Sequence, residues 1–399
     1  MRERIDLRTT WMLTGNALRI AMGMGLHRGG PFESHFTPFE LEYRRRLWWQ
    51  VAILDTRVGE LAGFGASPVA IDSDSKSPEN YNDDDLYPEM KELPEPRIGA
   101  TEMLFVRCRS SFREYGRSKG IAPLFMGVSR VDMKLAEREK RIRELEIMFE
   151  QNVLRYCDPL ESLHVLVSTM ARTVIHRLRL KAYHPMHNQA TVDKSLTEKE
   201  KDVCFQSALK ILEYDNHVFG SPNLKGFQWH VRAHYQWDAL ITVLAELRRR
   251  PDATTVKAWK QVEQNFIYHP EFIEETRKPL NLAVSNLCLK AWAARETAHK
   301  EANPSWMPLK TPKFIERLRE KQAKRKTPSP HMPQQDNPLD VPLAAFPDQP
   351  DFAEFANASM DPTFFGTGGM GMGQMDWSLW NDTLQFHEPQ THSLPWLSR

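Results

Sequence analysis

The sequence has few of the features that mark a secreted, disulfide-bonded or membrane-spanning protein. Its 399 residues include four cysteines, Cys108, Cys157, Cys204 and Cys288, which are far apart and form no C-x-x-C pair. We therefore predict free thiols in a reducing compartment, rather than a disulfide framework or a structural zinc site. The N-terminal stretch MRERIDLRTTW lacks an apolar signal segment. No run of about 18 apolar residues predicts a transmembrane helix.

Neither positive nor negative residues are in marked excess, because the formal net charge is +1. This balance gives no global indication of a nucleic-acid or membrane partner. We find neither internal repeats nor the period-two alternation that is typical of strands. Apolar residues instead recur every three or four positions, which predicts an all-α protein. The helices expected beyond residue 98 span 99–118, 129–157, 159–183, 196–219, 226–249, 253–267 and 271–300.

The two helices expected before residue 66 have the clearest signals. The first ends at HRGGP, and its predicted core stripe consists of Trp11, Thr14, Leu18, Ala21 and Gly25. The second begins with a capping box formed by Thr37 and Glu40. Its predicted apolar ridge consists of Leu47, Val51, Leu54, Val58 and Leu61.

A basic and aromatic run, YRRRLWWQVAILD, lies inside the second helix. Arg44, Arg45 and Arg46 spread around nearly a full helical turn, so they cannot all face one nucleic-acid duplex. Trp48 and Asp55 share a face with Arg44. We therefore predict a structural role, in which Arg44 stacks on Trp48 and an arginine neutralises Asp55 at the edge of the core.

Metal and catalytic chemistry have weak support in the sequence. Residues 66–98 are rich in Pro, Asp, Ser and Asn and are predicted to form a surface loop. Within it, Asp84, Asp85 and Glu89 leave open a magnesium site of the kind found in all-helical diphosphate lyases, although the prolines oppose the helix which that site needs. His230 and His234 lie one helical turn apart without an evident third ligand, so we predict core-edge or surface histidines. The chain is predicted not to be an enzyme.

The composition changes after Trp306. A basic cluster at the end of the predicted folded part is a candidate nuclear-import signal, formed by Lys321, Lys324, Arg325 and Lys326. Residues 331–399 contain nine acidic residues and a single arginine, and are predicted to be disordered. Near their end, acids alternate with large apolar residues, a composition typical of acidic activation segments: Asp376, Trp377, Leu379, Trp380 and Leu384.

Several of these motifs resemble the central homology region of fungal binuclear zinc-cluster transcription factors. The matching residues are Leu26-His27-Arg28, the run from Arg44 to Trp49 including Trp48, and Asp55. NYNDDDLYPEM is similar to an acidic segment of that family, which explains the acids better than a metal site does. The resemblance covers about residues 8–300 and 373–385. It divides the chain into a helical regulatory domain (1–310), a basic helix end and linker (311–330), and an acidic and aromatic tail (331–399).

The resemblance implies a nuclear regulator of RNA polymerase II genes, of the secondary-metabolism type, with co-activators or the transcription machinery as partners and possible dimers with related regulators. In that family an N-terminal cluster of six cysteines binds two zinc ions and holds DNA. The sequence contains no such cluster, so we expect no cofactor in this chain, and zinc and DNA binding are expected of full-length relatives. Two alternatives stay open: a piece of a longer regulator, or an interaction protein that sequesters its relatives.

Overall fold

The computed structural model describes residues 7–62, 73–119, 133–183, 197–251, 255–275, 278–302 and 309–326. Every regular element in these ranges is a helix, which confirms the all-α prediction for this part of the chain. The candidate activation segment around Trp377 and Trp380 lies outside the described residues. Among the helices that are described, none combines the length and the apolar character needed to cross a bilayer.

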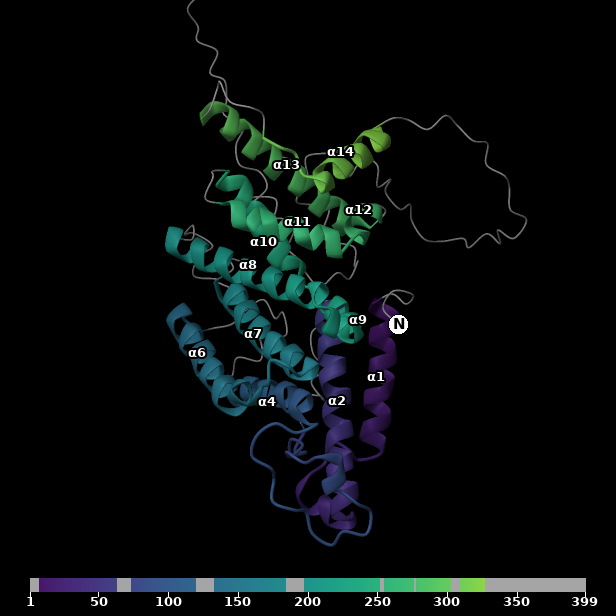
Figure 1. Ribbon diagram of the computed structural model, residues 1–399. Coiled ribbons are helices and arrows are strands. Elements are labelled where there is room, and N and C mark those ends of the chain that lie inside the picture. The colour runs from purple at the N-terminus through teal and green to yellow at the C-terminus, as the bar shows by residue number, and fades with distance from the viewer. Residues whose placement is uncertain are drawn as a thin grey trace, which may run out of the picture.

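Helices α1 (Leu7–Gly23) and α2 (Pro38–Ala62) form an antiparallel pair along one side of the molecule (Figure 1). The α1 prediction is confirmed at four of its five positions, since Thr14, Leu18, Ala21 and Gly25 are buried, and Trp11 is half-buried. The predicted capping box is also present. The Thr37 hydroxyl accepts a hydrogen bond from the Glu40 N–H (3.3 Å), and the Glu40 carboxylate accepts one from the Thr37 N–H (2.9 Å).

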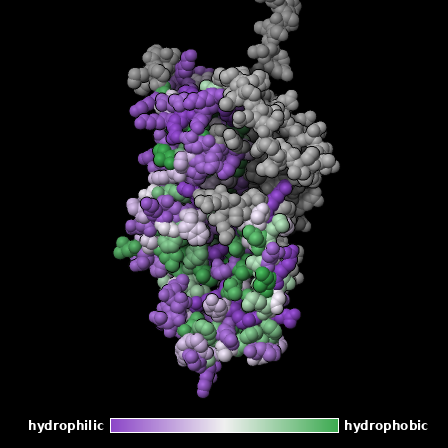
Figure 2. Space-filling view, turned by 90° about the vertical axis from the view of Figure 1, so that its right-hand side faces the viewer, coloured by the Kyte–Doolittle hydropathy of each residue, from purple (hydrophilic) through white to green (hydrophobic). Residues whose placement is uncertain are grey.

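The apolar ridge predicted for α2 is wrong at Leu47 and Leu54, whereas Val58 is buried and Val51 packs against the core. Leu47 and Leu54 are 41% and 49% exposed. The helix instead buries the neighbouring face, which carries Glu42, Arg45, Trp48, Trp49, Ala52, Asp55, Val58, Gly59 and Ala62. Two tryptophans offer far more apolar area than two leucines, and the charged residues on their face find partners. Figure 2 shows hydrophobic side chains gathered over the surface of this helix pair, where Met12, Ile20, Met24, Leu47 and Leu54 are exposed.

The remaining helices stack in layers beside and above this pair (Figure 1). Helix α4 (Leu104–Ser118) packs against α2, and α6 (Leu135–Asn152) and α7 (Ser162–Tyr183) pack against each other and against α4. Above them lie α8 (Glu198–Gly220), α9 (Gln228–Ala233), α10 (Trp237–Arg249), α11 (Val256–Tyr268), α12 (Glu271–Glu274), α13 (Pro279–Ala302) and α14 (Lys313–Lys326). Short 3₁₀ turns occur at Gly30–His35, Asp83–Asp85, Leu154–Tyr156 and Pro222–Phe227.

Two of the predicted helices, 226–249 and 271–300, are each broken into two. The first breaks between α9 and α10, where Tyr235 turns into the core and donates a hydrogen bond to Asn265 Oδ1 (2.6 Å). The second breaks before Pro279, which begins α13. Proline suits the first turn of a helix because it has no N–H to leave unpaired.

Helix α14 packs against the upper core. Phe314, Ile315 and Leu318 are buried there among side chains of α8, α10, α11 and α13. The candidate import cluster therefore begins on a packed helix, and Lys321 forms an ion pair with Glu274 (2.7 Å). Lys324 and Arg325 are exposed, and Lys326 is the last described residue of the helix. A stretch predicted as a helix end and linker thus contains a helix that contributes to the core.

A buried histidine connects α8 with the end of α11. His269 is 1% exposed, and its Nε2 lies 2.7 Å from Asp215 Oδ2 while its Nδ1 lies 3.3 Å from Glu271 Oε1. Burial by itself lowers the pKa of this histidine. The hydrogen bonds and charges of the two carboxylates outweigh burial and raise the pKa to about 9.

We expect this group to make the fold less stable as the pH rises. A histidine whose pKa is higher in the folded chain stabilises it fully below about pH 6.5, the unfolded value, and loses that contribution as the pH passes about 9. The difference amounts to about 3 kcal/mol. Urea unfolding across this window should give a falling free energy of unfolding for the wild type. His269→Asn should flatten it, and exposed His217→Asn should not. Equal slopes for wild type and His269→Asn would contradict the assignment.

Candidate functional site

The two tryptophans of α2 fasten the segment 73–76 to the helix. Trp48 is 1% exposed, and its indole N–H donates to Ser73 Oγ (3.0 Å). The indole N–H of Trp49 donates to the backbone oxygen of Lys76 (2.8 Å). Each ring therefore supplies apolar burial together with one satisfied polar atom. Their role in the described structure is to hold the loop in place.

The predicted stacking of Arg44 on Trp48 is wrong. The Arg44 guanidinium lies 3.9 Å from the centre of the Phe36 ring and also donates to the Met24 carbonyl. The aromatic neighbour of Trp48 is instead His27, with ring centres 5.8 Å apart. Residues four apart share a helix face, but Trp48 turns into the core while the longer arginine reaches across to the connecting turn.

The next two arginines form ion pairs within the protein. Arg45 is 6% exposed and donates to both carboxylate oxygens of Glu33 (2.9 and 3.0 Å). Arg46 bridges Glu42 (3.3 Å) and Asp83 (2.7 Å). These contacts join α2 to the turn before it and to the acidic loop after it, and they leave neither guanidinium directed at an external phosphate.

Asp55 is buried between α1 and α4. It is 2% exposed and accepts a hydrogen bond from Thr14 Oγ1 (3.2 Å). Burial raises its pKa, against the hydrogen bond of Thr14 and the positive charges of Arg113 and Arg19. One of the two arginines whose charge acts on Asp55 therefore comes from α4. Residue spacing within α2 could not have indicated it.

The LHR motif lies in the turn that follows α1. Leu26 is 3% exposed within the core, and the Arg28 guanidinium lies 5.6 Å from the Phe32 ring centre. The N–H of Gly29 donates to Asp74 Oδ1 (2.8 Å). A Cβ atom at residue 29 would collide with the backbone carbonyl of Asp74, so this close approach of two chain segments requires glycine.

The magnesium hypothesis for the acidic loop is contradicted. Asp85 forms a two-point ion pair with Arg97 (2.6 and 2.5 Å), and it also caps the turn by accepting the Asn82 N–H (2.8 Å). Asp84 and Glu89 are exposed to solvent. A diphosphate-binding site needs these carboxylates to converge on a cavity, and they do not.

The residues described do not fit a zinc cluster either. The four cysteines lie on or near different helices, and within the described ranges no three histidine, cysteine, aspartate or glutamate side chains converge as metal ligands would. Burial raises the pKa of Cys108 and of Cys204 to about 12, and it also raises that of Cys288. These thiols stay protonated at neutral pH, whereas zinc needs thiolates.

A cavity of about 230 Å³ lies where α2, α4, α7, α8 and α9 meet. The longer helices contribute residues spaced three and four apart, such as Met170, Thr173, Val174 and Arg177 on α7. One part of the wall is apolar, and it includes Phe112, Phe149, Leu166, Met170, Val174 and Leu212. Pockets that bind small molecules combine such a wall with a few convergent polar groups.

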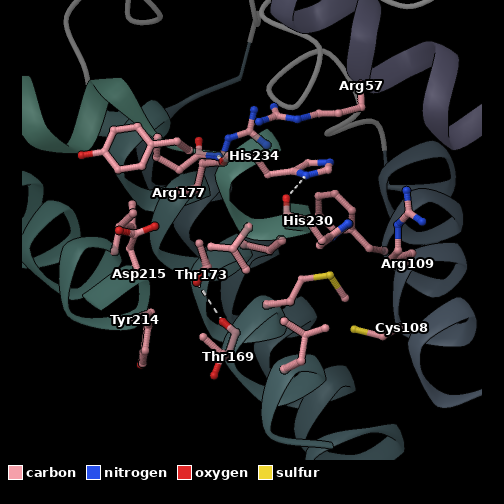
Figure 3. Close-up of a pocket in the computed structure, with 18 of the residues that line it drawn as sticks. Arg57, Cys108, Arg109, Thr169, Thr173, Arg177, Tyr214, Asp215, His230 and His234 are labelled. Atoms are coloured by element: carbon pink, nitrogen blue, oxygen red, sulfur yellow. Dashed lines mark hydrogen bonds between the residues drawn. The ribbon is translucent and has the colours of Figure 1, made fainter. Parts of the chain in front are cut away.

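Those polar groups are mostly cationic (Figure 3). Arg57 from α2 and Arg177 from α7 lie together at one end of the cavity. Glu60 forms an ion pair with both, and its Oε2 lies 2.6 Å from Nη1 of Arg57. Lys181 also contacts Glu60, at 2.7 Å. Burial lowers the pKa of Arg57 to about 10, while the charge of Asp238 raises it. Burial lowers the pKa values of Arg177 and Lys181 well below their usual range.

The two histidines singled out by spacing lie in the wall of this cavity. His234 donates from Nδ1 to the backbone oxygen of His230 (2.8 Å). Burial, followed by the charges of Arg109 and Arg57, lowers the pKa of His230 to about 4. The pKa of His234 is lowered well below its usual range, again chiefly by burial. Both rings are therefore neutral at neutral pH, and Nε2 of His234 is a hydrogen-bond acceptor.

The arginines of this cavity were not predicted from the sequence. Arg109, Arg113 and Arg117 recur every four residues on α4 and all line it. Arg109 donates to Gln50 Oε1 (3.0 Å), and Arg113 donates to the Ala52 carbonyl (3.0 Å). Such a basic stripe is detectable in a sequence, but exposed arginines on a solvated helix face give the same pattern. Only the packing of α4 on α2 distinguishes arginines that line a cavity from arginines on a solvated face.

The chain is similar to fungal transcription factors. Residues 3–120 match the fungal specific transcription factor domain. The aurofusarin cluster transcription factor aurR2 of Gibberella zeae is 32% identical over 302 residues, which cover 75% of this chain and 44% of the relative. The transcriptional regulator AacuB of Aspergillus aculeatus is 29% identical, over 76% of this chain and 42% of the relative.

A third relative extends the same likeness. The pyriculol/pyriculariol biosynthesis cluster transcription factor 1 of Pyricularia oryzae is 29% identical, covering 80% of this chain and 43% of its own. The chain thus spans less than half the length of these curated relatives. The matched domain and the relatives are transcription factors and regulators, not enzymes. No solved structure matches the chain.

Proposed function

We propose that this chain, which is similar to fungal transcription factors and matches the fungal specific transcription factor domain over residues 3–120, regulates RNA polymerase II genes of secondary metabolism in the nucleus. The observation that carries the proposal is the likeness over three quarters of the chain to a named cluster transcription factor. The helical part acts as the regulatory domain. DNA is reached through a zinc cluster on another segment or another subunit, as expected of full-length relatives.

The tail is proposed to recruit co-activators or the transcription machinery. Its acids keep Trp377, Leu379 and Trp380 in solution, while the same apolar side chains offer anchors for a groove on a partner. The second candidate function is sequestration of related regulators by dimerisation. The exposed apolar side chains on α1 and α2 favour it, since such groups gain free energy when a partner covers them.

A tethered reporter assay tests the activator function. The whole chain, and a version that ends at Pro330, are fused to a heterologous DNA-binding domain in yeast. We expect the whole chain to activate the reporter several-fold and the truncated chain to leave it silent. The double change Trp377→Ala and Trp380→Ala should lose most of the activation because it removes both anchors.

The matched control is Trp396→Ala, which removes a tryptophan of the same tail outside the acidic segment and should leave activation unchanged. If neither fusion activates although both are expressed in the nucleus, the activator function is wrong. Co-purification with a full-length relative would then support sequestration instead.

A further inference from the structure

The cavity between α2, α4, α7, α8 and α9 is large enough for an organic molecule of about two rings. Its volume is about 230 Å³. An apolar protein cavity of roughly 150 Å³ is known to hold benzene. Phe112, Phe149 and Met170 line its apolar part, where flat rings can pack against aromatic and thioether groups.

The charges of the same cavity select for an anion. Arg57, Arg177 and the neighbouring Lys181 share the Glu60 carboxylate, and Asp238 adds a second negative charge from further away. Among the described residues that line the cavity, five arginines face two carboxylates, Glu60 and Asp215, and Asp215 already pairs with His269. Burying an uncompensated charge is costly, and a bound anion would offset that cost.

An unsatisfied donor marks the position for the anion. The Nε–H of Arg177 is buried and has no hydrogen-bond partner among the described residues. Figure 3 places the Arg177 and Arg57 side chains together, with the His234 ring beside them. Nε2 of His234 is an acceptor, so a hydroxyl group on the ligand could donate to it.

We propose that this cavity binds a small organic anion, a carboxylate or phenolate carried on an apolar ring system. The negative oxygen lies between Arg57 and Arg177, and the rings lie against Phe112, Phe149 and Met170. Guanidinium groups suit this task because they pair with carboxylates through two parallel hydrogen bonds. The inference goes beyond the proposed function, and it concerns binding by the purified chain, so it stands or fails without any result from the reporter assay.

The test is calorimetric titration of the whole purified chain with 2-naphthoate and with its neutral isostere 2-naphthamide, at neutral pH. We expect one site that binds the anion about tenfold or more tighter than the amide, because only the carboxylate compensates the cavity's charge. Arg177→Gln should remove this preference. Arg143→Gln, an exposed arginine of α6 that pairs with Glu139, is the matched control and should leave binding unchanged.

A cavity-filling change keeps the proposal falsifiable if Arg177→Gln does not fold. Met170→Trp should occupy the apolar part and lower the affinity for 2-naphthoate by about tenfold or more while the circular dichroism spectrum stays helical. The proposal is overturned if the two probes bind equally, if 2-naphthoate does not bind at concentrations of about 1 mM, or if Met170→Trp folds and leaves binding unaltered.

Discussion

Trp48→Ala should lower the free energy of unfolding by about 3–5 kcal/mol, as truncation of a buried tryptophan does. The side chain is 1% exposed and packs in a cluster with Leu18, Ala21, Leu26, Trp49 and Ala52. Its removal opens a cavity between α1 and α2 and also leaves the Ser73 hydroxyl without its donor. Urea unfolding followed by far-ultraviolet circular dichroism measures the loss.

Leu47→Ala is the matched control for this change. The leucine precedes Trp48 in the chain but is 41% exposed, so its truncation should cost less than about 1 kcal/mol. The apolar ridge predicted from helical spacing would give the opposite order, with Leu47 as the costly position. Equal losses for the two variants would contradict the orientation of α2 in the structure.

Glu60→Gln should destabilise the fold by about 3 kcal/mol, although glutamine has almost the same shape. One carboxylate, 12% exposed, is shared by Arg57, Arg177 and Lys181. Removing its charge leaves three cations close together in a poorly solvated site. The charge of Asp238, which is further away, still acts on all three. The free energy of unfolding at neutral pH, from urea titration, tests this expectation.

Glu198→Gln provides the comparison. Glu198 also bridges two cations, Lys201 (3.0 Å) and Arg249 (2.9 Å), but its side chain is 67% exposed. Water screens an ion pair of that kind, so its loss should be far smaller than that of Glu60. If the two variants lose equal stability, the shared carboxylate is not the centre of a desolvated charge cluster.

The class of the fold and many of its local features follow from the amino-acid sequence. The three-and-four spacing on α1 marks its buried stripe, and Thr37 with Glu40 fixes where α2 begins. These features depend on residues within one or two helical turns, so a one-dimensional pattern contains them. The motifs around His27 and Trp48 likewise pointed to the fungal transcription factors to which the chain is similar.

Which face of α2 is buried, and where the cavity lies, depends on contacts between helices that are far apart in the chain. The choice between the leucine face and the tryptophan face depends on what α1, α4 and the segment 73–76 offer as partners. The cavity gathers Arg57, Arg109 and Arg177 from three helices and His234 from the end of α9, all distant in sequence. Charges that look solvated in a sequence become desolvated only when helices pack around them, and that packing depends on long-range contacts which no local spacing records.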